Sequence, residues 1–382
     1  MKVLTILGTR PEIIRLSRIM SVLDRVVEHK IVHTGQNYDY ELNDVFFDEL
    51  GVRRPNHFLE VNTSTLGRSL GEIIIKTEEV LLQEKPDAVL ILGDTNSSVA
   101  ILMAKRMKIP TYHMEAGNRS FDANVPEEIN RKMVDHLSDF NLVYTEHARR
   151  NLISEGLPHR FTYLTGSPMR EVLEYNLPKI KNSDILNRLQ LAKGKYFIVS
   201  IHREENVDNE HNLRAVIDSL RELSNVFQYP IIVSTHPRTR NRLAKIGLDL
   251  NDELIHFLKP FGFIDYNQLQ MNSFCAISDS GTISEESALL GFPAVTLRCS
   301  IERPEALDTA TIALSGHDKE TLVEGVKIAT ASRNLFSGAQ RELPEEYKIR
   351  NTSERVVRLI TGTAKLANRW RNLEEFSRYD WD

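Results

Sequence analysis

Short apolar runs alternate with segments of helical periodicity along the first half of the chain. Each run is rich in β-branched residues, and the segment at residues 65–83 repeats its apolar positions every three to four residues. This alternation is typical of βα units, whose strands pair in parallel, so the sequence predicts an α/β fold. The strands expected here are residues 2–7, 29–34, 88–92, 111–114, 140–144 and 163–165.

The same alternation restarts after a polar stretch at residues 178–195. The runs YFIVSI, PIIVST, LIHFL, FCAIS and AVTLR predict a second parallel sheet, with a domain boundary between residues 168 and 178. We expect a doubly wound α/β N-terminal domain at residues 1–170 and a second domain of the same class at residues 171–360. A helix and tail follow at residues 361–382, and the pattern leaves open which domain they pack on.

Composition excludes several classes of protein. The 382 residues are 41% hydrophobic and 26% charged, which is typical of a soluble globular chain. A net charge of −5 offers no general attraction for nucleic acid, and no run reaches the roughly 18 apolar residues of a membrane span. Cys275 and Cys299 are too few for a disulfide framework, so we expect a cytoplasmic protein.

Polar residues follow the predicted strands of the first half, where parallel sheets bind ligands. In GTRPE, Gly8 permits a tight turn and Arg10 would attract a phosphate or carboxylate. Asp94 and Glu115 follow two neighbouring strands, and Glu127 comes soon after. Such carboxylates can divide acid and base roles between them, although ordinary helix capping is the alternative for each.

In the second half, basic residues and small residues follow the strands. His202 and His236 are each followed by arginine or by proline and arginine, which suits phosphate binding and proton transfer as well as a purely structural role. The segment SDSGTISEE opens a helix whose small residues would let backbone N–H groups approach a diphosphate. Glu285 or Glu286 could accept hydrogen bonds from ribose hydroxyls, and Arg303 could reach the same place.

Several well-known motifs are absent from the sequence. There is no G-x-G-x-x-G after the first strand and no G-x-x-x-x-G-K-[ST], which argues against a standard dinucleotide or P-loop enzyme. There is also no HExxH, no cysteine pair and no DxDxDG pattern. We therefore expect no metal site and no bound cofactor.

Eight motifs in order resemble those of the non-hydrolysing UDP-N-acetylglucosamine 2-epimerase family. They are GTRPE, GDTNSS, EAGNRS, PEEINR, HREEN, STHPRTR, SDSGTISEE and ERPEA, between residue 8 and about residue 306. The resemblance implies two Rossmann-like domains facing across a cleft in the GT-B manner, a homodimer, and no metal or redox cofactor. It also implies anti elimination of UDP across C1 and C2 of a UDP-sugar, a bound 2-acetamidoglucal, and re-addition of UDP after protonation of the other face of C2.

The same resemblance assigns two groups of residues. Those that would hold UDP are Arg10, His236, Tyr266 beside the uracil, Ser280, Gly281, Glu286 and Arg303. Those that would transfer protons and orient the sugar are Asp94, Glu115, Glu127 and His202, positioned by Arg131. Which carboxylate acts as base on each face of C2 stays open.

Two positions depart from the family pattern. Arg15 replaces the usual lysine and is kept among the expected catalytic residues, and Asn118 replaces the usual leucine in a shortened loop between Glu115 and Glu127. In bacterial UDP-GlcNAc enzymes this region binds a second, activating UDP-GlcNAc, so the resemblance does not carry substrate activation over to this chain.

The motif variants MEAGNRSFD, VPEEINRKMVDH and SDSGTISEES are more similar to one particular branch of the family. That branch acts on UDP-2-acetamido-2,6-dideoxy-L-talose and makes UDP-N-acetyl-L-fucosamine for capsules and O-antigens. Three alternatives remain open: a UDP-GlcNAc 2-epimerase giving UDP-ManNAc, a UDP-sugar glycosyltransferase with the same architecture, and a nucleotide-sugar sensor without catalysis.

Overall fold

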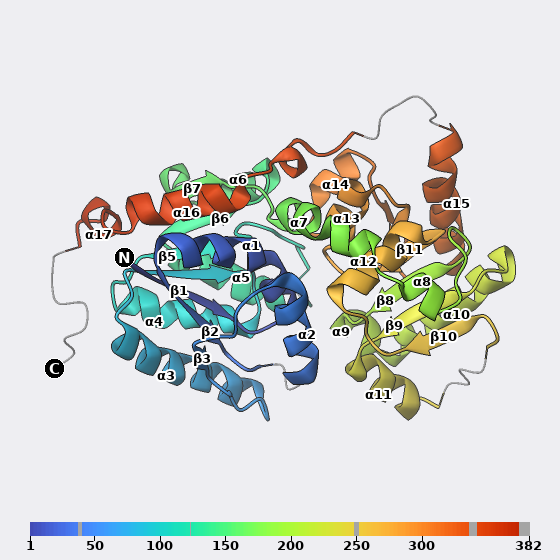
Figure 1. Ribbon diagram of the computed structural model, residues 1–382, viewed down its shortest axis with the longest axis horizontal. Coiled ribbons are helices and arrows are strands. Elements are labelled where there is room, and N and C mark those ends of the chain that lie inside the picture. The colour runs from blue at the N-terminus through green and yellow to red at the C-terminus, as the bar shows by residue number, and fades with distance from the viewer. Residues whose placement is uncertain (37–39, 123, 248–251, 336–341, 374–382) are drawn as a thin grey trace. The chain divides into compact units, whose positions relative to one another are not determined.

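Two compact units make up the structure, a computed structural model that describes residues 1–36, 40–122, 124–247, 252–335 and 342–373 (Figure 1). Unit 1 contains Met1–Tyr175 and the chain from Lys348 onward, and unit 2 contains Asn176–Tyr347. Each unit is built around one parallel sheet with its own hydrophobic core.

Unit 1 contains a seven-stranded parallel sheet in the order β3-β2-β1-β4-β5-β6-β7. This is the Rossmann order with a seventh strand added at one edge. The central strands are almost wholly buried because helices cover both faces, which explains their continuous apolar runs. The strands are β1 (Lys2–Leu7), β2 (Glu28–His33), β3 (His57–Phe58), β4 (Ala88–Leu92), β5 (Thr111–Met114), β6 (Phe140–Val143) and β7 (Thr162–Leu164).

The helices of unit 1 pack on both faces of its sheet. One face carries a core cluster shared with α3, α4 and α5, while α1 packs against α16 (Figure 1). Thr65 caps α3 by accepting a hydrogen bond from the Arg68 N–H. The helices are α1 (Arg10–Val26), α2 (Tyr40–Leu50), α3 (Leu66–Glu84), α4 (Ile101–Arg106), α5 (Pro126–Leu137), α6 (Glu146–Ser154), α16 (Thr352–Thr363) and α17 (Ala367–Trp370), with 3₁₀ turns η1 (Asn96–Ala100) and η2 (His159–Phe161).

Unit 2 repeats the Rossmann order with six parallel strands, β10-β9-β8-β11-β12-β13. Alternate side chains of β8 serve opposite faces: Phe197 and Val199 join one core cluster, and Ile198 joins the other. The strands are β8 (Phe197–Ile201), β9 (Ile231–Thr235), β10 (Ile255–Leu258), β11 (Cys275–Ser278), β12 (Ala294–Thr296) and β13 (Ala313–Leu314).

Helices also cover both faces of the unit 2 sheet. The cluster on one face includes α10 and α15, and the cluster on the other includes α8, α12, α13 and α14. The elements are α8 (Ile185–Arg188), α9 (Glu204–Val207), α10 (Glu210–Phe227), α11 (Pro237–Lys245), α12 (Phe263–Asn272), α13 (Ile283–Leu290), α14 (Pro304–Asp308), α15 (Lys319–Leu335) and η3 (Glu345–Lys348).

The predicted α/β class with two parallel sheets is confirmed, and each expected strand ends within two residues of its predicted limits. The two-residue edge strands β3 and β13 were not predicted, since two residues carry no periodicity.

The expected domain limits differ from the observed units. The predicted boundary at residue 170 lies five residues before the observed one, which falls inside α7 (Met169–Lys181), a helix that runs from one unit into the other. The assignment of residues 348–360 to the second domain is wrong: this segment belongs to unit 1 because α16 packs on α1 and Thr352 donates a hydrogen bond to the Thr165 carbonyl. Of the predicted tail at residues 361–382, the part to residue 373 lies in unit 1 and residues 374–382 lie outside the described residues.

The described helices contain no segment that combines the length and apolar character of a membrane span.

Candidate active-site residues in the two units

The strand order defines one special position in each sheet. The direction of winding reverses between β1 and β4 in unit 1 and between β8 and β11 in unit 2. In open α/β sheets, ligands bind beyond the carboxyl ends of the strands at this point. The segments that begin there are Gly8–Thr9, which leads into Arg10 of α1, and the loop containing Asp94 in unit 1, and the loops containing His202 and Ser280 in unit 2.

In unit 1 a buried carboxylate, Glu12, ties together the two loops at this point. The backbone N–H groups of Gly8 and Thr9 each donate to Oε2 of Glu12 over 2.7 Å, and the Thr95 hydroxyl donates to its Oε1 over 2.9 Å. Burial raises the pKa of the Glu12 carboxyl to about 7, against the effect of these donors. Sequence reasoning missed this residue, although Thr9 and Glu12 have the spacing of a capping box.

Two ion pairs bring together four of the predicted catalytic residues. Arg131 of α5 pairs with Asp94, which follows β4, and Arg15 of α1 pairs with Glu115, which follows β5. The Arg15 guanidinium also lies over the ring of Tyr144, 5.6 Å from its centroid. Arg15, Glu115 and Arg131 are all buried, so each of these charges depends on its partner.

Glu115 has a backbone conformation that is unusual for a residue with a side chain. Its φ is +64°, in the left-handed region, which costs a non-glycine residue about 1–2 kcal/mol. The Asn118 amide lies 3.4 Å from Oε1 of the same carboxylate. The loop after β5 therefore holds Glu115 in a conformation that the surrounding contacts must stabilise.

Glu127 and its neighbour Glu128 have different environments in the first turn of α5. Glu127 is half-buried. Glu128 is buried and accepts hydrogen bonds from the backbone N–H and hydroxyl of Ser120, while Arg131 Nη1 lies 3.9 Å away. Glu128 thus anchors the loop after β5 to α5.

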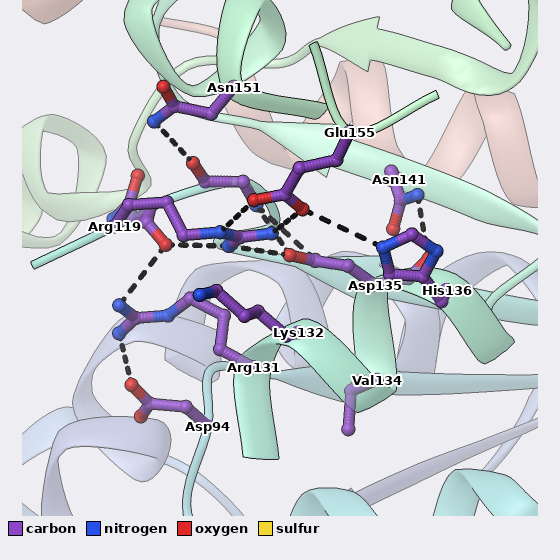
Figure 2. A network of polar contacts seen from close by, with 12 residues as sticks. Asp94, Arg119, Arg131, Lys132, Val134, Asp135, His136, Asn141, Asn151 and Glu155 are labelled. Carbon is purple, nitrogen blue, oxygen red and sulfur yellow. Dashed lines mark hydrogen bonds and ion pairs between the residues drawn. The ribbon is translucent and has the colours of Figure 1, made fainter. Parts of the chain in front are cut away.

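A second set of buried charges supports the same loop (Figure 2). Asp135 of α5 accepts from the Gly117 N–H and pairs with both His113 of β5 and Arg119. Arg119 in turn makes two hydrogen bonds to Glu155, of 2.8 and 2.6 Å. Burial opposes ionisation of Asp135, but the contacts with His113 and Arg119 outweigh it and hold its pKa below the usual range.

This network also reaches the loop after β4. His113 Nε2 lies 2.8 Å from the Gly93 carbonyl oxygen, directly before Asp94, and Arg119 Nη1 donates to the Asn118 carbonyl. Because Arg131 and Asp135 are one helical turn apart on α5, one helix fixes both loops that carry acids. Sequence reasoning missed this network, because its members lie on β5, on α5 and in the segments that follow β5 and α6.

Arg10 is the first residue of α1 and is half-buried. Its guanidinium lies 5.8 Å from the ring centroid of Phe46 on α2. Arg10 thus lies beyond the carboxyl end of β1, at the N-terminus of a helix.

In unit 2 the counterpart of Glu12 is Asp279, a fully buried carboxylate after β11. It accepts hydrogen bonds from the backbone N–H groups of His202 and Arg203 and from the Asn206 amide, and it pairs with the His202 ring. The two loops at the switch point of unit 2 are thereby joined, and His202 is held at the end of β8.

The other predicted histidine, His236, lies at the N-terminus of α11. Its Nδ1 accepts a hydrogen bond from the Arg238 N–H over 3.3 Å, and its ring is half-buried. In the neutral ring the proton therefore resides on Nε2, which can donate to an anion.

Ser280 and Gly281 lie between β11 and α13. Ser280 is half-buried and its hydroxyl lies 3.0 Å from that of Thr282. A Cβ at Gly281 would meet only ordinary contacts, 3.7 Å from Arg203 and 3.9 Å from Glu302. Protein atoms therefore do not by themselves require glycine at position 281.

Tyr266, Glu286 and Arg303 are all engaged by other residues of unit 2. The Tyr266 hydroxyl hydrogen-bonds to Ser200 and Ser278, and burial raises its pKa. Glu286 accepts from the Gln270 amide over 2.8 Å, and buried Arg303 pairs with Glu285 over 3.4 Å. Of the two glutamates considered for the ribose, Glu285 is thus the partner of Arg303.

Within the part of the chain that the structure describes, no three histidine, cysteine, aspartate or glutamate side chains are grouped as a metal site requires.

Known proteins are similar to this chain along almost its whole length. The family model described as UDP-N-acetylglucosamine 2-epimerase matches residues 22–361. A solved structure named UDP-N-acetylglucosamine 2-epimerase from Rickettsia bellii is 46% identical, with a TM-score of 0.89 over 98% of this chain and 100% of that one. The Methanocaldococcus jannaschii UDP-GlcNAc 2-epimerase, solved in complex with UDP-GlcNAc and UDP, is 35% identical, with a TM-score of 0.88 over 95% and 100%.

A curated relative has a different substrate in its name. The UDP-2,3-diacetamido-2,3-dideoxy-D-glucuronate 2-epimerase of Pseudomonas aeruginosa is 32% identical over 89% of this chain and 97% of its own length. Together these similarities define an α/β isomerase that acts on nucleotide sugars. The chain belongs to the UDP-N-acetylglucosamine 2-epimerase family, and its activity is of the UDP-GlcNAc 2-epimerase type.

Proposed function

We propose that this isomerase inverts C2 of UDP-2-acetamido-2,6-dideoxy-L-talose and so makes UDP-N-acetyl-L-fucosamine. The observation that carries the choice of sugar is that both departures from the family pattern, Arg15 and Asn118, contact the same carboxylate, Glu115. A guanidinium in place of a compact ammonium, and an amide in place of an apolar group, change what this carboxylate can hold. The name of the P. aeruginosa relative agrees with variation of the sugar within the family.

The proposed reaction is an elimination followed by re-addition. A carboxylate takes the C2 proton while the C1–O bond breaks, and UDP leaves with the electron pair to give a 2-acetamidoglucal. A proton is then delivered to the opposite face of C2, and a phosphate oxygen of UDP re-forms the bond to C1. No electrons are gained or lost overall, so the proposed reaction requires no redox cofactor.

Unit 1 supplies the acids in this proposal. Asp94, Glu115 and Glu127 accept and return protons and orient the sugar, while Arg131 and Arg15 fix the first two of them through the ion pairs described above.

Unit 2 supplies His202 and most of the UDP ligands. The C2 proton is weakly acidic, so its loss depends on stabilisation of the departing diphosphate. The residues proposed to bind UDP are His236, Tyr266, Ser280, Gly281, Glu286 and Arg303, together with Arg10 of unit 1.

A second candidate substrate is UDP-GlcNAc, which would be converted to UDP-ManNAc. The names of the R. bellii and M. jannaschii structures favour it. The chemistry and the assigned residues are the same for both sugars. Family membership leaves no reason to keep a glycosyltransferase or a non-catalytic sensor as candidates.

Proton NMR in D₂O distinguishes the two substrates. The purified protein is incubated with UDP-2-acetamido-2,6-dideoxy-L-talose in one tube and with UDP-GlcNAc in another. We expect a new epimer with deuterium at C2 in the first tube at a rate at least tenfold above that in the second. A faster reaction with UDP-GlcNAc would overturn the proposed sugar, and absence of exchange in both would overturn the reaction.

We further propose a cytoplasmic homodimer that supplies sugar nucleotides for a capsule or O-antigen. Cys275 and Cys299 are both described by the structure and neither is in a disulfide, which suits a reducing compartment. Light scattering at several protein concentrations would test this proposal, and we expect a molar mass twice that of one chain.

A further inference from the structure

In unit 2 the ring of His202, a residue proposed to transfer protons, contacts the fully buried carboxylate of Asp279. His202 Nδ1 lies 3.1 Å from Oδ1 of Asp279, whose side chain is 0% exposed, while the His202 side chain is 41% exposed. Oδ2 of the same carboxylate accepts from the backbone N–H groups of His202 and Arg203 over 3.0 and 2.9 Å. One carboxylate therefore fixes both the backbone and the ring of His202.

This contact determines where the ring carries its proton. A carboxylate oxygen can only accept, so this 3.1 Å contact favours a proton on Nδ1 of His202. The neutral ring then has an unprotonated Nε2. His236 has the opposite arrangement, because its Nδ1 accepts from the Arg238 N–H.

We propose that Asp279 is a positioning residue that keeps one proton on Nδ1 of His202, so that Nε2 can accept a second proton from the substrate and return it during epimerisation. The catalytic part of this inference rests on the proposed function, whereas the placement of the proton does not. His236, with its proton on Nε2, is suited to donate to a phosphate, and the two histidines of unit 2 thus have different roles.

The charge of Asp279 supports this arrangement. Burial opposes ionisation, but the neighbouring His202 and the hydrogen bonds from Arg203 and Asn206 lower the pKa of Asp279 to about 2. The charge of Asp279 also favours the protonated forms of two neighbouring groups, His317 and the Tyr266 hydroxyl. His317 Nε2 donates a hydrogen bond to Oδ1 of Asn206 over 2.6 Å. Asp279 is therefore the anion that faces the His202 ring.

The first test measures the wild-type protein and uses one variant only to assign the signals. Two-dimensional ¹⁵N NMR of histidine-labelled protein distinguishes a ring protonated at Nδ1 from one protonated at Nε2, and His202→Asn identifies the His202 signals. At a pH where the ring is neutral, we expect the proton on Nδ1. A neutral His202 with its proton on Nε2 would overturn the proposal without any measurement of turnover.

The second test removes the charge of Asp279. In Asp279→Asn we expect a larger fraction of His202 with its proton on Nε2, and kcat at least tenfold lower with KM within about threefold. His202→Asn and the double variant should have equal kcat, because Asp279 acts through His202. A further loss in the double variant, or an unchanged kcat in Asp279→Asn, would contradict the positioning role.

A matched control separates this effect from loss of loop structure. Asn206→Ser removes one donor to Asp279 but leaves the contact with His202. We expect lower stability with the proton of His202 still on Nδ1, and a change of tautomer in this variant would overturn the specific role of Asp279. A wild type with the proton on Nδ1 but no C2 exchange would overturn the proposed function and leave the placement of the proton supported.

Discussion

Arg15 and Glu115 form a buried ion pair in unit 1, with 3.7 Å between Nη1 and Oε2. Arg15 comes from the second turn of α1, and Glu115 from the loop after β5, where its φ is +64°. The pair therefore joins a helix to a strained loop, and it does so at a position where the family pattern has lysine. Removing the cation leaves a buried carboxylate without this partner.

Arg15→Met should lower kcat at least a hundredfold, because the charge that orients Glu115 is lost. Arg15→Lys keeps the charge but loses the planar fork, and we expect a loss of about tenfold or less. Turnover of both UDP-sugars by each variant, measured by NMR, checks this order. Equal losses in the two variants would show that charge at position 15 is not what matters.

Glu127→Gln and Glu128→Gln should have different consequences. Glu127 is half-buried and proposed to act on substrate, so its variant should lose about a hundredfold or more in kcat with unchanged stability. Glu128 is buried and bonded to Ser120, so its variant should unfold at a lower denaturant concentration. Denaturation and turnover measured on both proteins test the assignment. Loss of stability in Glu127→Gln together with loss of kcat alone in Glu128→Gln would show that Glu128 acts on substrate and Glu127 is structural.

Asp135→Asn should destabilise unit 1 by about 3–5 kcal/mol, because it leaves buried His113 and Arg119 beside a neutral amide. Lys132→Gln on the same helix is the control: Lys132 is half exposed and pairs with Glu128 at 3.7 Å, so its loss should cost about 0.5 kcal/mol or less. Urea denaturation followed by fluorescence measures both. Similar losses in the two variants would mean that the network of Figure 2 contributes little stability.

The sequence predicted most of the fold because parallel strands buried on both faces leave a strong apolar pattern. The two-residue edge strand β3 leaves no such pattern. The packing of α16 on unit 1 depends on contacts between residues about 190 positions apart, such as Thr352 with Thr165. No local pattern carries that information.

Sequence reasoning found candidate site residues where a titratable residue comes within a few positions of the end of a strand, as Asp94 and His202 do. The buried residues that hold them, such as Asp135 and Asp279, were not. Each acts through a partner more than 15 residues away in the sequence, Gly117 and His202 respectively. Their roles depend on the fold and become visible only in three dimensions.

The stability of unit 1 should fall as the pH rises from about 4.5 to about 7, through the titration of Glu12. Its pKa is raised by burial from 4.5 to about 7, so the folded state favours the protonated form: this stability is present below pH 4.5 and is lost as the pH rises through about 7. The shift corresponds to about 3 kcal/mol. Denaturation of wild type and Glu12→Gln between pH 5 and 8 should show the variant gaining relative to wild type, and parallel profiles would rule this out.

Arg303→Ala should weaken binding of UDP about 10- to 100-fold, through loss of a charge-assisted hydrogen bond. The same variant also leaves buried Glu285 without its partner at 3.4 Å, which could by itself disturb the site. Glu285→Gln combined with Arg303→Ala separates the two causes, because it removes the uncompensated charge. If Arg303 contacts UDP, the double variant binds UDP as weakly as Arg303→Ala in calorimetric titration. Recovery of wild-type affinity in the double variant would instead show that Arg303 serves only to neutralise Glu285.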